Sequence, residues 1–591
     1  MPMARFPHGI ILVGLVAAVA SGCWSSGEPR ATATPTPTPR SLTPLVVAFV
    51  GEPSTFNPII DESRTGRAVG GAVFDTLIRL DPVTAEARPN LATEWQYDAE
   101  KHAYTLLLRD DVYWHDGEPF TARDVVFTID AIHAVPESPY ARILNIDAKP
   151  VRAAIAGTHS VRFQLPRPYA PFIQSLVVPI MPAHRFPDDL TGDALNEMIL
   201  AWGATSRPEE VIGTGPFRIE TYAPREHVVL RHNPAYWRYD EAGARLPYLD
   251  RYILRVAEDR ESAMRWFLDG AIHIFNPSFD EVATLQSASA TSGFVVEEIG
   301  PDTGSLFLTF NRNPLHYRKG DKTDPRFSWF NDRRFLAAIA HAIDKERIID
   351  EVLQGMGQPA VSIIPPANSF ADARLVDYAY NLDLARETLD DAGYRDRNRD
   401  GTREDPSGTA IAFSLATNED NPVREKIAKL VVAQLAEIGM RVSLETLPFP
   451  TLFERLDATY DWDAMLVGFT GSVDPASSEN LLRSSGELHV WHPLQSQPAT
   501  KWEAEVDALL DRGSRELDLE TRREIYARVQ EILHKQLPMI HLVRPTLFAA
   551  RRVDVENFQP SPWGFDQIDG LRLRAPEPTA PARGDGAATG R

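Results

Sequence analysis

Hydrophobic positions follow two different periods along this chain, which predicts a mixture of strands and helices. Residues 45–50 and 104–109 are short apolar runs typical of buried strands, and residues 440–444 alternate as a half-buried strand does. Residues 332–343 and 421–438 carry apolar side chains at three- and four-residue spacing, as the buried face of a helix requires. No regular βαβ period or internal repeat is present. This mixed α+β pattern alone does not indicate a function.

Capping residues mark where several helices are expected to begin and end. Asp332 is expected to cap the helix over 332–343, and a second helix is expected from Asp344 to Gly355. Asn421-Pro422 provides a cap and a first-turn proline, and Gly439 ends that helix. Thr521 and Glu524 have the spacing of a capping box, which predicts a further helix that starts at Thr521.

The amino terminus has the features of a secretory signal. Arg5 precedes an apolar run at residues 10–20, which is too short to span a bilayer as a helix. Ala20-Ser21-Gly22-Cys23 resembles the lipobox of bacterial lipoproteins, and Cys23 is the single cysteine of the chain. We therefore expect residues 1–22 to be a signal peptide and Cys23 to be lipidated. The alternative is an ordinary signal peptide whose cysteine is incidental.

Two segments are expected to lie outside the folded body. Thr and Pro alternate over residues 31–40, which favours an extended, solvated spacer, so residues 23–43 are expected to form a lipid anchor and linker. Residues 575–591 are rich in Ala, Pro and Gly and are expected to be a disordered tail. The protein is expected outside the cytoplasmic membrane, tethered by Cys23, and on the periplasmic side if an outer membrane is present.

Composition limits the class of protein. The 591-residue chain is larger than one hydrophobic core supports, so two or three domains are expected. The net charge of −21 argues against a nucleic-acid partner, which would require a basic face. It also disfavours direct adsorption to anionic lipid, which leaves an acyl anchor as the membrane contact. With one cysteine, no internal disulfide can form.

Catalytic and metal motifs give no enzyme assignment. The sequence contains no Gly-x-Ser-x-Gly, no His-Glu-x-x-His, no Gly-Lys-Ser/Thr loop and no Cys-x-x-Cys. His489 and His492 are close in sequence but have no nearby third ligand. Residues 396–401 match the first half of an EF-hand loop, but Ser407 stands where a bidentate Glu is required, which favours a polar turn. No catalytic residue, metal or cofactor is expected.

Several motifs in a fixed order resemble one known family. They resemble the extracytoplasmic solute-binding proteins of ABC importers, in peptide (oligopeptide, dipeptide and nickel) receptor family 5. The similar blocks are Pro89-Asn-Leu-Ala-Thr-Glu-Trp95, residues 108–125, Ile212-Gly-Thr-Gly-Pro-Phe217, Asn233-Pro-Ala-Tyr-Trp237, residues 334–345 and Asp391-Ala-Gly-Tyr394. From the residues alone, Trp95, Trp114 and Trp237 are expected to be packing anchors, and Gly213 and Gly215 to allow close backbone approach.

This resemblance implies a fold and a way of working. The fold is a mixed α+β and α/β two-lobed periplasmic-binding-protein fold, type II, of the large peptide-receptor class, with an extra accessory domain. A solute, by default a peptide, binds between the lobes and passes to an ABC permease and ATPase complex; the protein is expected to be a monomer and not an enzyme. The implied segments are lobe one at 44–76, 212–301 and 551–574, the accessory domain at 77–211 and lobe two at 302–550, with crossings near 302 and 550.

The resemblance also implies a cleft strand at residues 463–475, whose backbone pairs with an extended peptide. Peptide receptors of this kind usually hold an aspartate for the peptide ammonium three residues after an aromatic, but here Ser472 follows Phe469 at that spacing. Asp474 is either a replacement for that aspartate or a turn residue. Trp491 is a candidate because it is an aromatic residue in a polar segment, and core packing is the alternative for every aromatic candidate. The expected ligand contacts are Tyr140, Phe307, Asn311, Phe449, Phe469, Thr470, Gly471, Ser472, Asp474 and Trp491.

Other functions remain open at this point. Within the same class, Ser472 motivates an alternative to the peptide receptor, which is a receptor for a sugar, an opine or a similar non-peptide solute. A hydrolase on the same scaffold, or a sensor or chaperone-like binder without a dedicated permease, would belong to a different class.

Overall fold

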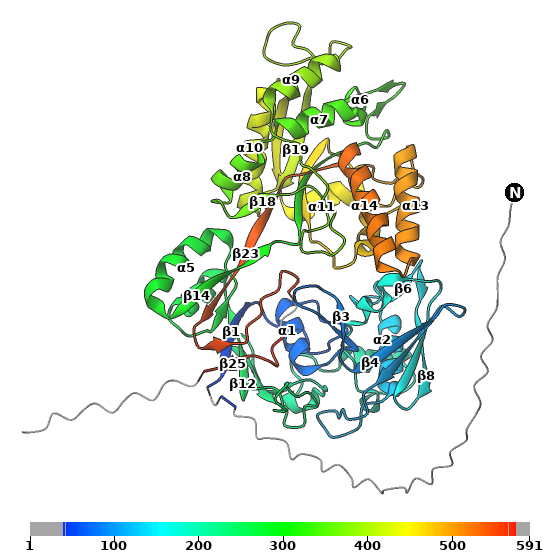
Figure 1. Cartoon of the computed structure of the whole chain (residues 1–591), viewed down its shortest axis with the longest axis vertical. Coiled ribbons are helices and arrows are strands. Elements are labelled where there is room, and N and C mark those ends of the chain that lie inside the picture. Colours follow the sequence, from blue (N-terminus) through cyan, green and yellow to red (C-terminus); the bar gives the residue numbers. More distant parts are fainter. Residues whose placement is uncertain (1–39, 42, 565–566, 575–591) are drawn as a thin grey trace, which may run out of the picture.

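The computed structural model describes residues 40–41, 43–564 and 567–574. The expected signal peptide, the lipidation site Cys23, most of the Thr-Pro spacer and the expected tail lie outside these residues. Within this described part of the chain, no helix combines the length and apolar character that crossing a bilayer requires. Figure 1 shows two bodies arranged along the long axis of the molecule, with β23 running from one to the other.

The lower body in Figure 1 contains a sheet built from distant parts of the sequence. Strand β1 lies in its interior, parallel to β12 and β13, and β23 lies between β13 and β14. β18 adds to the other end of β23. The strands, in spatial order, are β10 (Phe217–Ala223), β11 (His227–His232), β12 (Arg251–Ala257), β1 (Leu45–Val50), β13 (Ile274–Phe275), β23 (Val543–Arg552) and β14 (Phe294–Pro301), with β18 (Gly357–Pro359) beside β23.

A second, antiparallel sheet lies in the same lower body. Its order is β4 (Ala92–Asp98), β5 (Ala103–Leu108), β9 (Ser160–Gln164) and β8 (Arg152–Gly157), and α2 (Ala122–Ala134) packs against β8 and β9. One hydrophobic cluster runs through both sheets of this body. Trp114 and Trp237 are buried in it, and Trp95 packs partly buried against it, so the core role expected for these tryptophans is confirmed.

The upper body contains a five-stranded sheet that is buried on both faces. Its order is β20 (Arg441–Leu447), β19 (Ala412–Asn418), β21 (Ala464–Phe469), β15 (Ser305–Phe310) and β22 (Met539–His541). Leu308 and Leu466 belong to the cluster under α7 (Arg333–Ala342), α8 (Lys345–Val352) and α10 (Pro422–Glu437). Phe307 and Met465 belong to the cluster under α13 (Lys501–Arg515) and α14 (Leu519–Gln536). Alternate residues of each strand therefore serve opposite cores.

The chain passes twice between the two bodies. The first passage is the short segment between β14 and β15, at residues 302–304. In the second, β22 ends in the upper sheet at His541, and β23 pairs with β14 from Thr546 onward, so the chain crosses between these residues. The resemblance implied a second crossing near residue 550. β23 is a continuous strand that pairs with β18 through its first residues and with β14 through the rest, so it spans the passage itself.

Helix starts agree with the sequence at three of four sites, including Asp344, which accepts from the amide of Arg347 at the start of α8. Asp332 accepts a hydrogen bond from the amide of Arg334 at the start of α7, and Asn421 accepts one from Arg424 at the start of α10. The prediction for Thr521 is wrong. Helix α14 begins at Leu519, because the Asp518 carboxylate already accepts the Thr521 amide at 2.9 Å, and Thr521 lies inside the first turn.

Two of the sequence blocks meet in the interior of the lower body. A Cβ atom at Gly213 would lie 1.8 Å from the carbonyl oxygen of Val73, which confirms the expected close approach of backbone. The His115 ring accepts from the Gly213 amide through Nδ1 at 3.1 Å and reaches the Gly215 carbonyl through Nε2 at 3.2 Å. Burial lowers the pKa of His115 to about 3, so the ring is neutral. These motif residues serve the scaffold and not a ligand.

Candidate ligand-binding site

The end of β21 has a backbone edge with a strand neighbour on one side only. β15 pairs with β21 along its whole length, from Ala464 to Phe469. β19 pairs with it only at Ala464 and Met465. Among the strands described, residues 467–469 therefore have β15 as their one partner. An extended chain can add to such an edge through main-chain hydrogen bonds.

A cation lies beside this edge. A Cβ atom at Gly468 would be 3.3 Å from Nη2 of Arg424, so the glycine leaves room for the guanidinium against the strand. Nη1 of Arg424 donates to Asn418 Oδ1 at 2.6 Å, whereas its buried Nε has no hydrogen-bond partner among the described residues. Burial lowers the pKa of Arg424, and Asp420 acts in the opposite direction. A guanidinium in this position can bind a carboxylate.

Two aromatic candidates form a stack that leads from the core to the end of β21. The rings of Phe307 and Phe469 are 5.9 Å apart and nearly parallel. Phe307 is fully buried and also contacts the ring of His541 at 5.7 Å, so it is a core residue. Phe469 is half-buried and carries the stack outward. It is the better placed of the two to contact a solute.

The polar residues after Phe469 are held by the protein itself. Ser472 donates through Oγ to the carbonyl of Asp474 at 3.0 Å, and its own carbonyl accepts from Asn368 Nδ2 at 2.9 Å. Thr470 is exposed and Gly471 half-buried. Ser472 thus has internal partners on both its hydroxyl and its carbonyl.

Asp474 forms a buried ion pair. Its Oδ1 accepts from Arg522 Nη2 at 2.7 Å, and the two side chains are 4% and 7% exposed. The same oxygen accepts the amide of Ala476 and so caps the 3₁₀ turn Pro475–Ser478. Burial would lower the pKa of Arg522, but its hydrogen bond and charge interaction with Asp474 raise it. The carboxylate therefore already has a cation, and its Oδ2 is buried without a partner among the described residues.

Two other candidates have structural roles in the interior of the upper body. Asn311 is fully buried and donates through Nδ2 to the carbonyls of Tyr460 and Trp462, both at 3.0 Å. Trp491 is fully buried, and its Nε1 donates to Glu503 at 3.3 Å. These contacts account for both side chains without a ligand.

The remaining two candidates lie apart from β21 in the sequence and in their surroundings. Phe449 is the first residue of α11 (Phe449–Glu454), is 49% exposed, and stacks on Phe453 with ring centres 6.1 Å apart. Tyr140 is half-buried against the core of the lower body, where burial raises the pKa of its hydroxyl.

The segment after β21 reaches the boundary between the two bodies. Val473 packs against the hydrophobic cluster of the lower body. Arg167 of the lower body pairs with Asp147 and donates to Ser514 Oγ of α13 at 3.2 Å. A cavity of about 480 Å³ lies close by, lined by Tyr97 and Pro168 of the lower body and by residues of the α13–α14 turn. None of the predicted ligand residues lines it.

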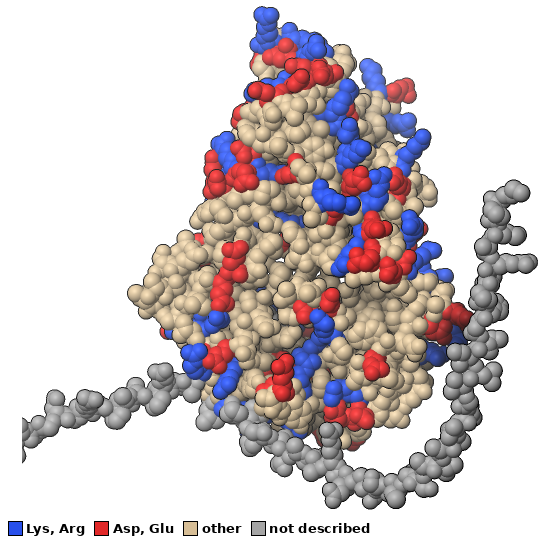
Figure 2. Space-filling model, in the orientation of Figure 1, with Lys and Arg blue, Asp and Glu red and all other residues tan. Residues whose placement is uncertain are grey.

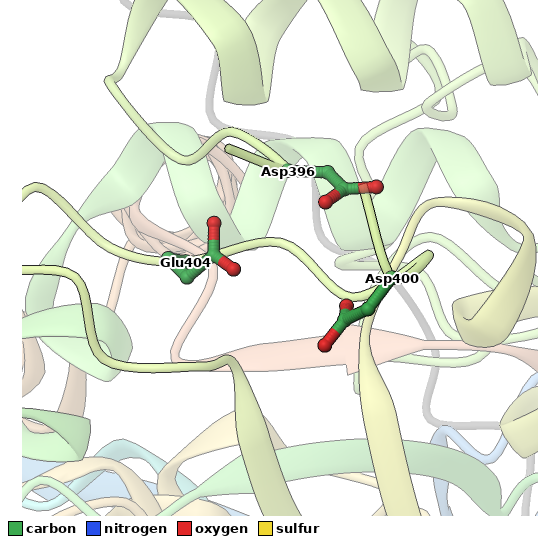
Figure 3. Close-up of side chains that lie close together, drawn as sticks. All are labelled: Asp396, Asp400 and Glu404. Atoms are coloured by element: carbon green, nitrogen blue, oxygen red, sulfur yellow. The ribbon is translucent and has the colours of Figure 1, made fainter. Parts of the chain in front are cut away.

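Three carboxylates in the loop before β19 form a compact group (Figure 3). Oxygen atoms of Asp396, Asp400 and Glu404 lie within 4.8 Å of one another. Asp396 accepts the amides of Arg399 and Gly401, as expected for the polar turn that the sequence favours. Glu404 accepts the amide of Arg397. Glu404 lies outside the part of the loop that matches an EF-hand, and an antiparallel bridge to Arg395 brings it beside the turn.

Comparison with known proteins identifies the scaffold. The family model described as "Bacterial extracellular solute-binding proteins, family 5 Middle" matches residues 86–487. The chain belongs to this family. The di/tripeptide-binding protein 1 of Pseudomonas aeruginosa is 26% identical over 546 residues, which cover 89% of this chain and 93% of that protein. The expected family and its class, a solute-binding protein and not an enzyme, are confirmed.

Solved structures show the same fold for this family 5 protein. The oligopeptide-binding protein AppA of Bacillus subtilis, in complex with a nonapeptide, superposes with a TM-score of 0.65 at 23% identity and covers 91% of this chain and 100% of its own. NikA from Brucella suis, in complex with Fe(III)-EDTA, gives a TM-score of 0.72 at 22% identity, with 90% and 100% covered. The predicted two-lobed fold is confirmed.

Sequence reasoning did not single out Arg424, which the structure places beside the end of β21. It is the third residue of α10, whose cap the sequence did reveal, but its position beside Gly468 depends on how α10 packs on the sheet. An arginine near a helix start is ordinary in sequence. Only knowledge that positions 424 and 468 are in contact would have pointed to this arginine.

On the face shown in Figure 2, Lys and Arg side chains are intermixed with Asp and Glu, above all on the right side of the upper body, where Figure 1 places α13 and α14. Figure 2 shows no separate basic area on this face, in keeping with the acidic net charge. A nucleic-acid partner would require such an area.

Proposed function

We propose that this protein is a lipid-anchored receptor that captures peptides between its two lobes and delivers them to an ABC import permease with its ATPase. The observation that carries the peptide assignment is the half-open edge at residues 467–469 with Arg424 beside it. Its similarity to a di/tripeptide-binding and an oligopeptide-binding protein supports the same class of solute.

Each part of a peptide has a partner in this proposal. Its backbone pairs with residues 467–469, its carboxylate binds Arg424, and one side chain packs on Phe469. Its ammonium group receives no dedicated carboxylate, because Asp474 is already paired with Arg522. A hydrogen bond to a charged group contributes about 1.5–3 kcal/mol, so the carboxylate end should dominate recognition.

Calorimetry with di- to pentapeptide pools tests the assignment. Each pool is used in three forms: unmodified, N-acetylated and C-terminally amidated. We expect amidation to weaken binding about 10- to 100-fold, from the loss of one charge-assisted contact. Acetylation should have little effect, since no acidic partner is lost.

Variants of two arginines identify the carboxylate partner. Arg424→Gln should bind unmodified and amidated pools equally. The matched control is Arg441→Gln, an exposed arginine on β20, which should keep the preference of the wild type. If Arg424→Gln retains the preference for free carboxylates, Arg424 does not bind them. If folded wild-type protein gives no heat with any pool, the peptide assignment is wrong.

The anchor and the closure of the lobes have their own tests. Cys23→Ser should move the protein from the membrane fraction to the soluble fraction. Membrane retention of that variant, with no acyl mass on the wild type, would exclude the lipid anchor. Solute binding between lobe one (44–76, 212–301 and 551–574) and lobe two (302–550) should close the lobes and reduce the radius of gyration in solution scattering at saturation.

A non-peptide solute is the second candidate. It is favoured by Ser472 in place of an aspartate and by the prior pairing of Asp474 with Arg522. NikA from Brucella suis, in complex with Fe(III)-EDTA, is a protein of the same fold that holds a solute other than a peptide. Mass spectrometry of small molecules that copurify with protein lacking residues 1–40 separates the two: a peptide mass supports the first and a metal chelate or sugar the second.

A further inference from the structure

A fully buried arginine lies where the chain passes between the two bodies. Arg544, in the first part of β23, is 1% exposed. It donates to the carbonyls of Asp302 at 3.4 Å, Thr303 at 2.8 Å and Gly304, and its other terminal nitrogen donates to two carbonyls further along the chain. Burial lowers its pKa to about 10, with Asp302 acting in the opposite direction, so the side chain stays charged at neutral pH.

The two further acceptors are the carbonyls of Ser362 at 2.6 Å and Ile363 at 3.1 Å. Among the described residues no carboxylate lies within ion-pair distance of Arg544, so backbone carbonyls compensate its charge. A buried charge is strongly unfavourable unless its hydrogen bonds are satisfied. The guanidinium therefore ties together the first passage at 302–304, the second passage from which it extends, and the 362–363 segment of the upper body.

The segment that follows β21 rests on the groups that Arg544 holds. A Cβ atom at Gly471 would lie 2.1 Å from the carbonyl oxygen of Thr303, so the backbone of Gly471 lies directly against that peptide group. A Cβ atom at Gly304 would lie 3.1 Å from the carbonyl oxygen of Phe469. The first passage and the candidate binding segment are thus in backbone contact.

A second connection closes a ring of contacts. Asn368, five positions after Ile363, donates through Nδ2 to the carbonyls of Ser472 at 2.9 Å and Val473 at 2.8 Å. Asn368 is 6% exposed, so these bonds are shielded from water. The segment 469–473 therefore contacts the first passage, whose carbonyls accept from Arg544. It is also hydrogen-bonded to Asn368, which follows the Arg544 acceptors at 362–363.

We propose that Arg544 is a positioning residue that couples the binding segment 469–473 to both passages between the lobes, so that the segment is preorganised for a solute and moves with the hinge. The effect of this coupling on solute affinity rests on the proposed function. The coupling itself is a property of the ligand-free protein. Preorganisation raises affinity by reducing the ordering that binding requires. Loss of Arg544 should increase local opening of both the first passage at 302–304 and the segment 469–473.

Hydrogen exchange of the ligand-free protein tests the coupling directly. In Arg544→Met we expect amides in 302–305 and 469–473 to exchange about tenfold faster or more than in the wild type, while the rest of the upper sheet keeps its protection. Arg551→Met is the matched control: Arg551 lies on the same strand but pairs with Glu297 of β14. It should leave both segments unchanged. Arg544→Lys, which keeps the charge with fewer directed donors, should restore part of the protection.

A second variant approaches the same contact from the other side. Gly471→Ala places a Cβ against the Thr303 carbonyl and should raise exchange in 302–305 although Arg544 is intact. Unchanged exchange there would overturn the coupling, and so would uniform acceleration across both bodies in Arg544→Met, which indicates a general loss of stability. If Arg544→Met fails to fold, Gly471→Ala and Arg544→Lys decide the question.

Binding of the unmodified peptide pools gives the functional readout. Dissociation constants should rise about tenfold in Arg544→Met and stay within about twofold of wild type in Arg551→Met. If no pool binds the wild type, the peptide assignment is wrong and the exchange result still judges the coupling. If pools bind and Arg544→Met binds them as the wild type does, the proposed preorganisation is wrong.

Discussion

The ion pair between Asp474 and Arg522 allows a quantitative test, because its two charges are almost completely withdrawn from water. The oxygen and nitrogen are 2.7 Å apart and the side chains 4% and 7% exposed. Arg522 also donates through Nε to the Gly513 carbonyl at 2.9 Å and lies over the ring of Phe370. Removal of one partner of such a pair leaves an uncompensated buried charge, which costs about 3–5 kcal/mol.

Three variants separate the pair from its surroundings. Asp474→Asn retains an oxygen for the Ala476 amide. The expected decrease in the free energy of unfolding, about 3–5 kcal/mol, is therefore due mainly to the unpaired guanidinium of Arg522. Arg522→Met leaves a buried carboxylate and an unsatisfied Gly513 carbonyl, and should cost at least as much. The double variant removes both charges and should cost less than the sum of the two by about 2 kcal/mol or more.

Urea unfolding followed by tryptophan fluorescence measures these free energies, provided that the slope with denaturant is equal among the variants. Strict additivity of the two single variants would refute the buried pair. The same variants report on recognition. We expect Asp474→Asn to affect free and N-acetylated peptides equally; a selective loss of free peptides with unchanged stability would show that Asp474 serves the ligand ammonium.

Three further predictions concern the lower body. His115 stays neutral in the native state down to about pH 3, whereas in the unfolded chain it is protonated near its ordinary pKa of 6.5. The free energy of unfolding should therefore decrease as the pH falls below 6.5, by about 2 kcal/mol at pH 5 from this residue. In urea titrations at several pH values, His115→Gln should lack this part of the pH dependence. Gly213→Ala would place a methyl group 1.8 Å from the Val73 carbonyl oxygen and should reduce stability by about 3 kcal/mol or more, seen as a lower unfolding midpoint; an unchanged midpoint would contradict the close approach. Asp569 is 3% exposed and pairs with Arg79 at 2.8 Å. Asp569→Asn should therefore cost about 3–5 kcal/mol and speed proteolysis of residues 567–574; equal cleavage rates would contradict a role of Asp569 in docking that segment.

Local features of the fold could be predicted from the sequence because their causes are local. Asp332 and Asn421 cap the helices that follow them, since an acceptor before an apolar periodic run has few alternatives. Thr521 shows the limit of this reasoning. Its spacing to Glu524 fits a capping box, but Asp518 is an equally good cap one turn earlier, and the apolar pattern does not distinguish the two starts.

The candidate site was predictable in part, because a sequence block located the strand but not its partners. Phe469 ends a strand of the upper sheet, but residues 470–475, which the expected cleft strand included, lie outside any strand. Asp474 is paired with a residue 48 positions away, and Arg424 lies against a glycine 44 positions away. These contacts depend on how helices pack on a sheet, which no periodicity encodes. Trp491 and Asn311 were candidates for ligand contact because the sequence near them does not show that distant segments bury them.

Most polar side chains around the end of β21 are already hydrogen-bonded within the protein, which limits what the candidate site can recognise. Ser472 and Asn368 make hydrogen bonds within the protein and would have to give up an internal partner to bind a solute. The charge of Asp474 is already compensated by Arg522. Among the described residues around β21, the groups left without full internal partners are the backbone edge at 467–469, the guanidinium of Arg424 and the buried Oδ2 of Asp474. A main-chain edge and a carboxylate-binding cation recognise features that all unmodified peptides share. Under the proposed function, selection should therefore depend on the free carboxylate and on peptide length more than on side-chain identity, since side-chain pockets would require polar groups that the fold already uses.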